Sequence, residues 1–426
     1  MKRSTTTIRL AAVAAAGALV LAACGGSSDS EGGSADKPAA KGDGTLTIGQ
    51  LLPQTGSLAF LGPPEFAGVD LAIKDINAAG GVNGKDVVGV KGDSGDTDSG
   101  IAPAETDKLL KAKSDVIIGA ASSGVSLTVI DKIMSAGTVE FSPANTSTAF
   151  DEGDYSKPDL YFRTAPSDIL QGAVLANLLI EDGKQNVAIL ARQDAYGETL
   201  AKEIAKNLKD AGSTVAASVL YSEKNGPGDS QITEIANAKA DAIVLVAFEE
   251  TTTIIPKLIQ AGAGPQDVST YFVDGNTANY GKGDAASLPD GTLKGTKGTI
   301  PGAEATSDFK DRLATVNSKL KDYSYSAESY DATVTSALAA IVAGDDSGEA
   351  IAKELPNVTK GGEKCDSFEA CAKLLKDDPK TDIDYDGVSG PIELGETGSP
   401  TAASIGIYEY DAKNKIKPVK YIAGNI

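Results

Sequence analysis

Short apolar runs alternate with longer amphipathic stretches along most of the chain from residue 45 onward. Residues 116–118 and 242–248 are apolar runs of the kind that form strands buried on both faces of a sheet. Residues 65–79 instead carry apolar side chains at helical spacing. This alternation predicts an α/β fold built from parallel sheets with right-handed crossovers.

Two rounds of the alternation follow one another, so we expect two doubly wound units. The predicted strands are residues 45–53, 86–90, 116–118, 139–141, 186–191, 214–221, 242–248 and 269–273. Predicted helices are 65–79, one ending near 113, one starting near 125, then 168–181, 196–211, 231–239, 251–262, 308–320, 326–343 and one around 371. Residues 275–302 form a glycine-rich connection, and short antiparallel strands are expected at 387–393, 403–410 and 415–421.

The N-terminus has the pattern of an export signal. Basic residues precede a short apolar run at 10–20, and the sequence LAAC at 21–24 resembles a bacterial lipobox. We therefore expect residues 1–23 to be a lipoprotein signal peptide and Cys24 to carry a lipid that anchors the protein to the cell membrane, outside the cytoplasm. Residues 24–44 are expected to form a flexible tether. The alternative is an ordinary secretory signal with a chance cysteine.

Charge and composition exclude several functions. The formal net charge is −20, which disfavours binding to nucleic acid or to anionic lipid. The chain contains no histidine, the commonest general base and zinc ligand. We expect no catalytic residue, no metal and no cofactor. An exported hydrolase remains an alternative, although the pentapeptide G-x-S-x-G of hydrolases is missing.

The remaining cysteines, Cys365 and Cys371, lie in an exported chain, where an even number favours a disulfide. They are too close in sequence to be bridged within one continuous helix. We therefore place Cys365 in a loop before the helix that contains Cys371, and expect a structural role for the pair.

The segment at 115–129 predicts an anion-binding turn. A buried strand leads through a tight turn to Ser122 and Ser123, which open a helix. The first N–H groups of a helix lack intrahelical partners and lie at the positive end of its dipole, so a carboxylate can bind there. The alternative is that both serines only cap the helix.

A second group is needed opposite that turn. Tyr196, Phe248 and Asp274 each follow a predicted strand of the second round. Ligands of doubly wound sheets bind beyond the carboxyl ends of the strands, so a cleft would gather these side chains. Each alone is more typical of a packing or surface residue, and it is their recurrence at equivalent points that favours a site.

One acidic stretch fits a calcium loop by spacing, since residues 382–387 with Glu393 match D-x-D-x-D-G-x5-E. That loop functions between two helices, whereas the residues after Asp386 favour a strand. We therefore predict a turn entering a strand and no metal site.

Motifs spread over nearly the whole chain resemble one family. They lie at residues 51–85, 117–126 (IIGAASSGVS), 141–147 (FSPANTS), 161–172 (YFRTAPSDILQG), 194–201 (DAYGETLA), 330–332 and 386–392 (DGVSGPI). The chain resembles the type I periplasmic binding proteins of the Leu/Ile/Val-binding branch, which deliver ligands to ABC importers. The resemblance implies two lobes joined by three hinge crossovers: lobe one from 45–166 and 301–384, and lobe two from 167–300 and 385–426.

The resemblance also implies residue roles. In amino-acid-binding members a serine turn holds the ligand carboxylate, which matches Ser122 and Ser123. The ammonium is held by a segment that matches Ala144 and Thr146, and by an acid that matches Asp274. A tyrosine that matches Tyr196 covers the ligand. Asp274 stands where a glutamate is frequent, and Phe248 with the two acids after it stands where some members have a Gly/Tyr-rich turn.

We therefore expect a lipid-anchored, extracytoplasmic solute-binding protein of an ABC importer. Its ligand is expected to be an amino acid, with branched-chain amino acids among the candidates, whose apolar part contacts Phe60, Tyr196 or Phe248. The expected partners are this ligand, the transmembrane permease subunits and the membrane, reached through the lipid. The alternatives are a ligand sensor for a membrane receptor, and a protein for amide, urea-like or aromatic acid ligands.

Overall fold

The computed structural model describes residues 41–155, 159–284 and 286–426. The predicted signal peptide, Cys24 and most of the predicted tether lie outside these residues. Within the described part, the predicted α/β class is confirmed, with two sheets of mainly parallel strands.

The first sheet has five parallel strands in the order β2-β1-β3-β4-β5. Their bounds are β1 Thr47–Leu52, β2 Val88–Asp93, β3 Val116–Gly119, β4 Val139–Ser142 and β5 Tyr161–Arg163. The apolar runs predicted as strands lie here because helices cover both faces of the sheet. We call this sheet with its helices lobe one.

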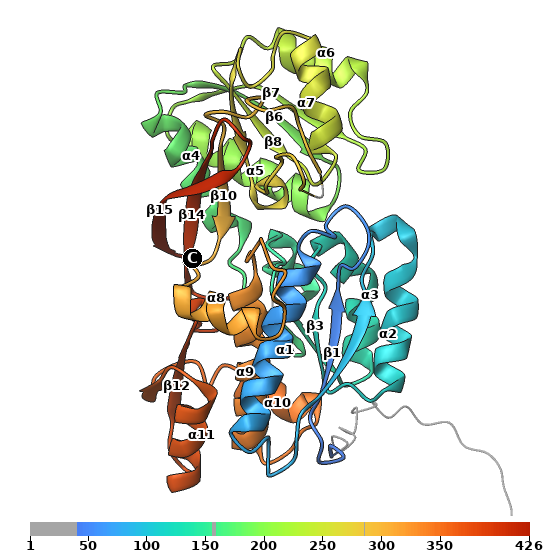
Figure 1. Ribbon diagram of the computed structural model, residues 1–426, viewed down its shortest axis with the longest axis vertical. Coiled ribbons are helices and arrows are strands. Elements are labelled where there is room, and N and C mark those ends of the chain that lie inside the picture. The colour runs from blue at the N-terminus through green and yellow to red at the C-terminus, as the bar shows by residue number, and fades with distance from the viewer. Residues whose placement is uncertain (1–40, 156–158, 285) are drawn as a thin grey trace, which may run out of the picture. The chain divides into compact units, whose positions relative to one another are not determined.

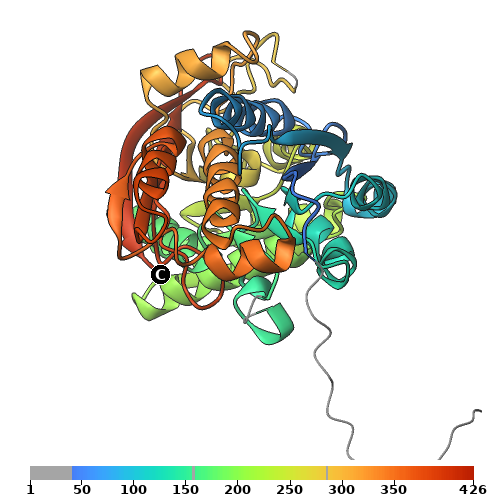
Figure 2. The same ribbon diagram turned by 90° about the horizontal axis from the view of Figure 1, so that it is seen from below.

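Two pairs of helices cover the faces of lobe one. Helices α1 (Gly62–Ala78) and α9 (Ser326–Ala343) lie side by side on one face, and α2 (Ile101–Lys111) and α3 (Ser123–Ser135) cover the other (Figure 1). Helices α1 and α9 are in contact, and in Figure 2 the blue helix α1 lies beside the orange helix α9 near the centre of the view. Apolar side chains of α8 (Ser307–Ala314), α10 (Gly348–Glu354) and α11 (Phe368–Asp377) join the α1–α9 side.

The second sheet has seven strands in the order β15-β14-β10-β9-β8-β6-β7. Their bounds are β6 Asn186–Arg192, β7 Thr214–Tyr221, β8 Ala242–Val246, β9 Ser269–Phe272, β10 Lys297–Pro301, β14 Ala402–Tyr410 and β15 Ile416–Asn425. Helices α4 (Asp168–Glu181) and α5 (Ala195–Asp210) pack on one face, and α6 (Asp229–Asn237) and α7 (Thr251–Gln260) on the other. This is lobe two.

The C-terminal strands only partly match the prediction. β14 and β15 are antiparallel, as predicted. The glycine-rich connection contains a strand, β10, that the sequence pattern does not predict. Its sequence KGTIP includes a glycine and a proline, which weaken the strand pattern. The strand predicted at 387–393 is only partly confirmed: β12 (Ile383–Gly387) ends at its first residue, and after a turn only Gly390–Pro391 form a strand, β13, which is antiparallel to β12. The helix predicted at 308–320 ends at Ala314.

The chain passes three times between the sheets, after β5, after β10 and before β14. The last passage comes later than the expected boundary at 384, because Tyr385, Ile392 and Leu394 pack in the apolar cluster of lobe one.

The disulfide joins Cys365 and Cys371, whose Cα atoms are 5.3 Å apart. Cys371 lies in α11, whereas Cys365 ends a short strand, β11 (Glu363–Cys365), where we had expected a loop. β11 pairs with β12, so the bridge fastens α11 to this small sheet. The acidic stretch tested as a calcium loop lies on β12, where Asp384 and Asp386 pair with Lys364.

Candidate functional site

A small enclosed space lies where loops of the two lobes meet. Its lining residues are Leu58, Leu61, Ala121, Ser122, Ser123, Ala144, Tyr196, Phe248, Asp274, Gly275 and Tyr325. We call it the central cavity. It brings together six of the eight ligand-site residues expected from the sequence, and it leaves about 10 Å³, roughly the room for one water molecule.

Apolar side chains close this cavity from both lobes. Loop residues of lobe one, namely Leu58, Leu61, Ala121, Ala144 and Tyr325, pack in the same apolar cluster as Tyr196 and Phe248 of lobe two. An amino acid is larger than the space left between them. Entry of such a ligand therefore requires the two faces to separate.

The lobe-one face begins with the turn from β3 into α3. Ser122 is the N-cap of α3, and its Oγ accepts a hydrogen bond from the N–H of Val125 at 3.5 Å. Ser123 is the first helical residue, so the unpaired N–H groups at the positive end of the helix lie at the cavity. Gly119 allows the turn: its φ is 128°, and an added Cβ would overlap the carbonyl oxygen of Leu51.

The loop after β4 is tied to that turn. The Oγ of Ser142 donates to the carbonyl of Ala120 at 2.6 Å, and the side-chain amide of Asn145 donates to the carbonyls of Ala120 and Ala121. These bonds hold Ala144 at the cavity wall. Thr146 is buried but does not line the cavity, and its carbonyl accepts a hydrogen bond from the N–H of Asp168.

The lobe-two face is centred on Asp274, which follows β9 and is buried. Its Oδ1 accepts hydrogen bonds from the hydroxyl of Tyr196 at 2.6 Å and from the amide of Gln171 at 3.0 Å. Its Oδ2 accepts one from the hydroxyl of Tyr325 in lobe one at 2.7 Å. Burial raises the pKa of Asp274, and these three uncharged donors oppose the rise.

Tyr325 and Gln171 were missed by the sequence prediction. Gln171 lies inside one of the family-like motifs, at 161–172, which gave a weak signal for it. Tyr325 precedes α9 with a φ of 58°, a left-handed conformation that is rare for a bulky residue. No periodic pattern indicates such a residue, so only the structure reveals this contact between the lobes.

A third missed residue, Asp168, lies buried near the first crossover. Its Oδ2 accepts a hydrogen bond from the hydroxyl of Thr199 at 2.8 Å. Burial raises the pKa of Asp168 to about 8, and the charge of Asp274 makes a smaller contribution in the same direction. The charge of Asp274 therefore adds to burial in disfavouring the ionisation of Asp168.

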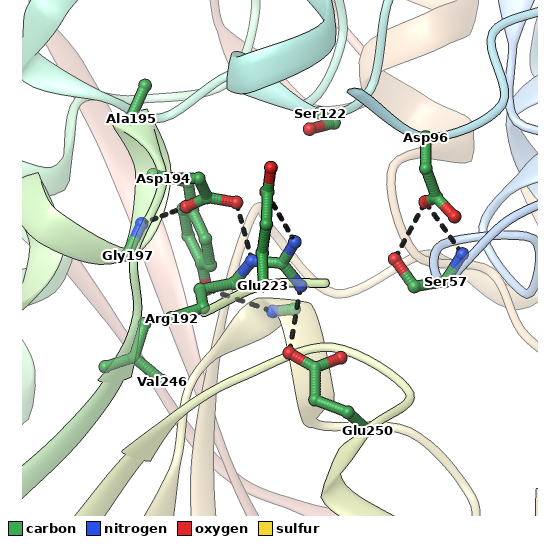
Figure 3. A network of polar contacts seen from close by, with 12 residues as sticks. Ser57, Asp96, Ser122, Arg192, Asp194, Ala195, Gly197, Glu223, Val246 and Glu250 are labelled. Carbon is green, nitrogen blue, oxygen red and sulfur yellow. Dashed lines mark hydrogen bonds and ion pairs between the residues drawn. The ribbon is translucent and has the colours of Figure 1, made fainter. Parts of the chain in front are cut away.

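Aromatic rings form the wall beside Asp274. Tyr196 stacks on Phe248, with ring centroids 5.3 Å apart and planes inclined by 24°. The guanidinium of Arg192 lies 3.5 Å from the centre of the Phe248 ring. Figure 3 shows how the carboxylates of Asp194, Glu223 and Glu250 surround that guanidinium.

A second cavity of about 680 Å³ shares Ser122 and Phe248 with the first, and we call it the outer cavity. Its charged lining residues are Asp96, Asp98, Arg192, Glu223, Lys224, Glu249 and Glu250. Ser122 and Asp96 lie across from Arg192 in Figure 3. Acids outnumber bases in this lining, so the electrostatic potential of the outer cavity is negative.

Phe60 does not line the central cavity, although it packs against the apolar cluster that contains Tyr196 and Phe248. It lines a separate cavity of about 370 Å³ with Pro63, Tyr280 and Leu320 among its neighbours. The neighbouring Leu58 and Leu61 line the central cavity instead. The loop that carries Phe60 thus contributes two leucines, but not Phe60 itself, to the lining of the central cavity.

Comparison with known proteins supports the fold and identifies a family. Residues 45–368 match the family described as periplasmic binding protein. A chemotactic signal transduction substrate-binding protein of Halobacterium salinarum is 26% identical over 82% of this chain and 83% of its own length. A Leu/Ile/Val-binding protein homolog of Brucella abortus is 30% identical over 62% of this chain and 71% of its own.

Solved structures share the same fold. A branched-chain amino acid binding protein of Streptococcus pneumoniae, in complex with isoleucine, aligns with a TM-score of 0.68 at 18% identity, covering 90% of this chain and all of its own. A solute-binding protein of R. palustris in complex with benzoate aligns with a TM-score of 0.68 at 17% identity, covering 90% and 98%. Among the described residues, none of the helices combines the length and hydropathy needed to cross a membrane.

Proposed function

Because the chain belongs to the periplasmic binding protein family, we propose that it captures an amino acid between its lobes and delivers it to the permease of an ABC importer. One observation carries this proposal. The central cavity has a helix N-terminus on its lobe-one face and a buried carboxylate, Asp274, on its lobe-two face. Opposite partial charges across one cavity suit a zwitterion with a carboxylate and an ammonium.

The ligand carboxylate would bind the N–H groups and hydroxyls at Ser122 and Ser123. Its ammonium would bind Asp274 and the carbonyl of Ala144, with Thr146 supporting that segment. The remaining lining is apolar and aromatic, so we propose a branched-chain side chain packed against Leu58, Leu61, Tyr196 and Phe248. Ligand entry separates the lobes, and closure restores the contact between Asp274 and Tyr325.

We further propose that lipid on Cys24 anchors the protein at the outer side of the membrane, within reach of the permease. The family supports an extracytoplasmic location, and the LAAC sequence at residues 21–24 supports the lipid anchor. Replacement of Cys24 by serine should release the protein from the membrane fraction into the soluble fraction. Continued membrane association of that variant would remove the anchor from the proposal.

The test of the ligand is a calorimetric titration of protein that starts after Cys24 and has been refolded to strip bound ligand. The panel is the standard amino acids with urea, short amides and benzoate. We expect binding of leucine, isoleucine or valine, and a weakening of about a hundredfold or more in Asp274→Asn, since a charged hydrogen-bond partner is lost. Glu140→Gln is the matched control, because it replaces a buried acid of β4 outside the cavity with its amide.

A second ligand class has specific support. The aromatic wall of Tyr196 and Phe248, together with an Asp274 already satisfied by uncharged donors, also suits an aromatic acid without an ammonium. In that case benzoate binds and Asp274→Asn binds it as well as the wild type does. That result would keep the importer role and reject the amino acid.

A second role has support from one relative, whose name assigns it to chemotactic signalling. In this alternative the closed lobes contact a membrane receptor in place of a permease. Uptake of radiolabelled ligand by cells that lack the protein separates the two roles. Unchanged uptake with a lost behavioural response would favour the sensor.

A further inference from the structure

Arg192 is a largely buried cation that lines the outer cavity. It ends β6, and its side chain is 6% exposed. Its Nε donates to Asp194 at 2.6 Å, its Nη1 to Glu250 at 3.0 Å and its Nη2 to Glu223 at 3.2 Å. Burial opposes the charge of Arg192, but the carboxylates of Asp194 and Glu250 raise its pKa.

These ion pairs exclude one role for Arg192. Three carboxylates around one guanidinium leave a net negative cluster, so the group does not attract a ligand carboxylate. All three guanidinium nitrogens already donate to protein carboxylates. What remains unused is its flat face, since a guanidinium is planar and stacks on aromatic rings.

That face lies against Phe248. The guanidinium carbon is 3.5 Å from the centre of the ring, and Phe248 in turn stacks on Tyr196. The hydroxyl of Tyr196 then donates to Asp274 at 2.6 Å. A continuous series of contacts thus runs from the ion pairs in the outer cavity to the carboxylate in the central cavity.

We infer that Arg192 is a positioning residue for ligand binding: its clamped guanidinium fixes the Phe248 ring against Tyr196 and so orients the Tyr196 hydroxyl toward Asp274. This rests on the proposed function only for its effect on affinity, because the orientation of the rings is a property of the protein itself. The three carboxylates serve to hold the plane of the guanidinium.

A double-mutant cycle measures whether Arg192 acts through Phe248. Arg192→Lys keeps the charge but has no planar face, and we expect it to weaken ligand binding about tenfold. In a Phe248→Ala background the same change should alter the affinity less than about twofold. Equal weakening in both backgrounds would overturn the inference. Lys202→Met is the matched control, since it changes an exposed basic residue of α5 outside the stack.

A second measurement needs no ligand. The ¹⁹F NMR signal of 4-fluorophenylalanine at position 248 reports the surroundings of that ring. We expect it to sharpen and move toward the free amino acid in Arg192→Lys, and to stay unchanged in Lys202→Met. An unchanged signal in Arg192→Lys would overturn the inference. Failure of every ligand to bind would reject the proposed function, but the ¹⁹F signal would still show whether Arg192 fixes the Phe248 ring.

If Arg192→Lys melts well below the wild type, a second variant replaces it. Glu223→Gln with Glu250→Gln retains Arg192 and removes the charge of two of its three clamping partners. The ¹⁹F signal should then sharpen and shift in the same direction as expected for Arg192→Lys. A ¹⁹F signal that stays at the wild-type position would show that the carboxylates around Arg192 do not fix the orientation of the Phe248 ring.

Discussion

The two faces of the central cavity are built in different ways. The lobe-one face consists mainly of backbone and small side chains at Ala121, Ser122, Ser123 and Ala144. The lobe-two face consists of the large side chains of Tyr196, Phe248 and Asp274, each supported by further side chains. The lobe-one face thus presents backbone groups at a helix N-terminus, whereas the lobe-two face presents aromatic and acidic side chains.

This difference suggests a division of labour. A helix N-terminus binds a carboxylate through backbone N–H groups, which do not depend on side-chain identity, so the lobe-one face fits many acids. The wall of lobe two depends on side-chain identity, and there an aromatic or acidic residue selects the rest of the ligand. Substitutions should therefore disturb backbone geometry in lobe one and ligand choice in lobe two.

The largest expected effect is on the backbone of lobe one. Gly119→Ala places a Cβ against the carbonyl of Leu51 at a φ of 128°, so we expect a loss of about 3 kcal/mol in the free energy of unfolding. Chemical denaturation measures it. The control is Gly212→Ala, which also has positive φ but meets no atom within 4 Å. Equal losses in both variants would show that the turn is not specially constrained.

A second prediction concerns a buried acid beneath that face. Burial raises the pKa of Glu140 from its usual 4.5 to about 8. The folded state then keeps a proton that the unfolded state loses, so stability is complete below pH 4.5 and falls as the pH rises toward 8. Glu140→Gln should remove this loss and stabilise the protein at pH 7, relative to pH 5, by about 2.5 kcal/mol.

Denaturation curves at both pH values measure the change. An identical pH dependence in Glu140→Gln and wild type would mean that other buried acids dominate. Asp168 in lobe two is the comparison, because burial and the charge of Asp274 raise its pKa to about 8 as well. Asp168→Asn should therefore give a change of the same sign.

The same contrast explains what could be predicted from the sequence. Ser122 and Ser123 follow directly after a buried strand, so a local pattern identifies the turn. Asp274, Tyr196 and Phe248 could be proposed because each follows a strand of a doubly wound sheet. Tyr325 and Arg192 act through contacts between distant segments, which no local period encodes. β10 was missed because pairing on both sides overrides the weak strand preference of KGTIP.

The next prediction tests the contact that joins the two faces. Tyr325→Phe removes the hydroxyl that donates to Oδ2 of Asp274 and leaves the ring in place. We expect ligand affinity to fall about tenfold, since closure loses a hydrogen bond to a charged group. Calorimetry measures it, with Tyr323→Phe as the control on the same segment. Tighter binding in Tyr325→Phe would show that the hydroxyl competes with the ligand for Asp274.

The smallest expected effect concerns the serine at the helix terminus. Ser122→Ala removes the capping oxygen of α3 but leaves its N–H groups, so we expect a loss of about 1 kcal/mol in stability. Ligand affinity should fall only about fivefold, because the backbone still binds the carboxylate. Ser122→Gly should behave similarly in binding. A loss as large as that of Asp274→Asn would mean that the lobe-one face also relies on a side chain, and the contrast between the faces would fail.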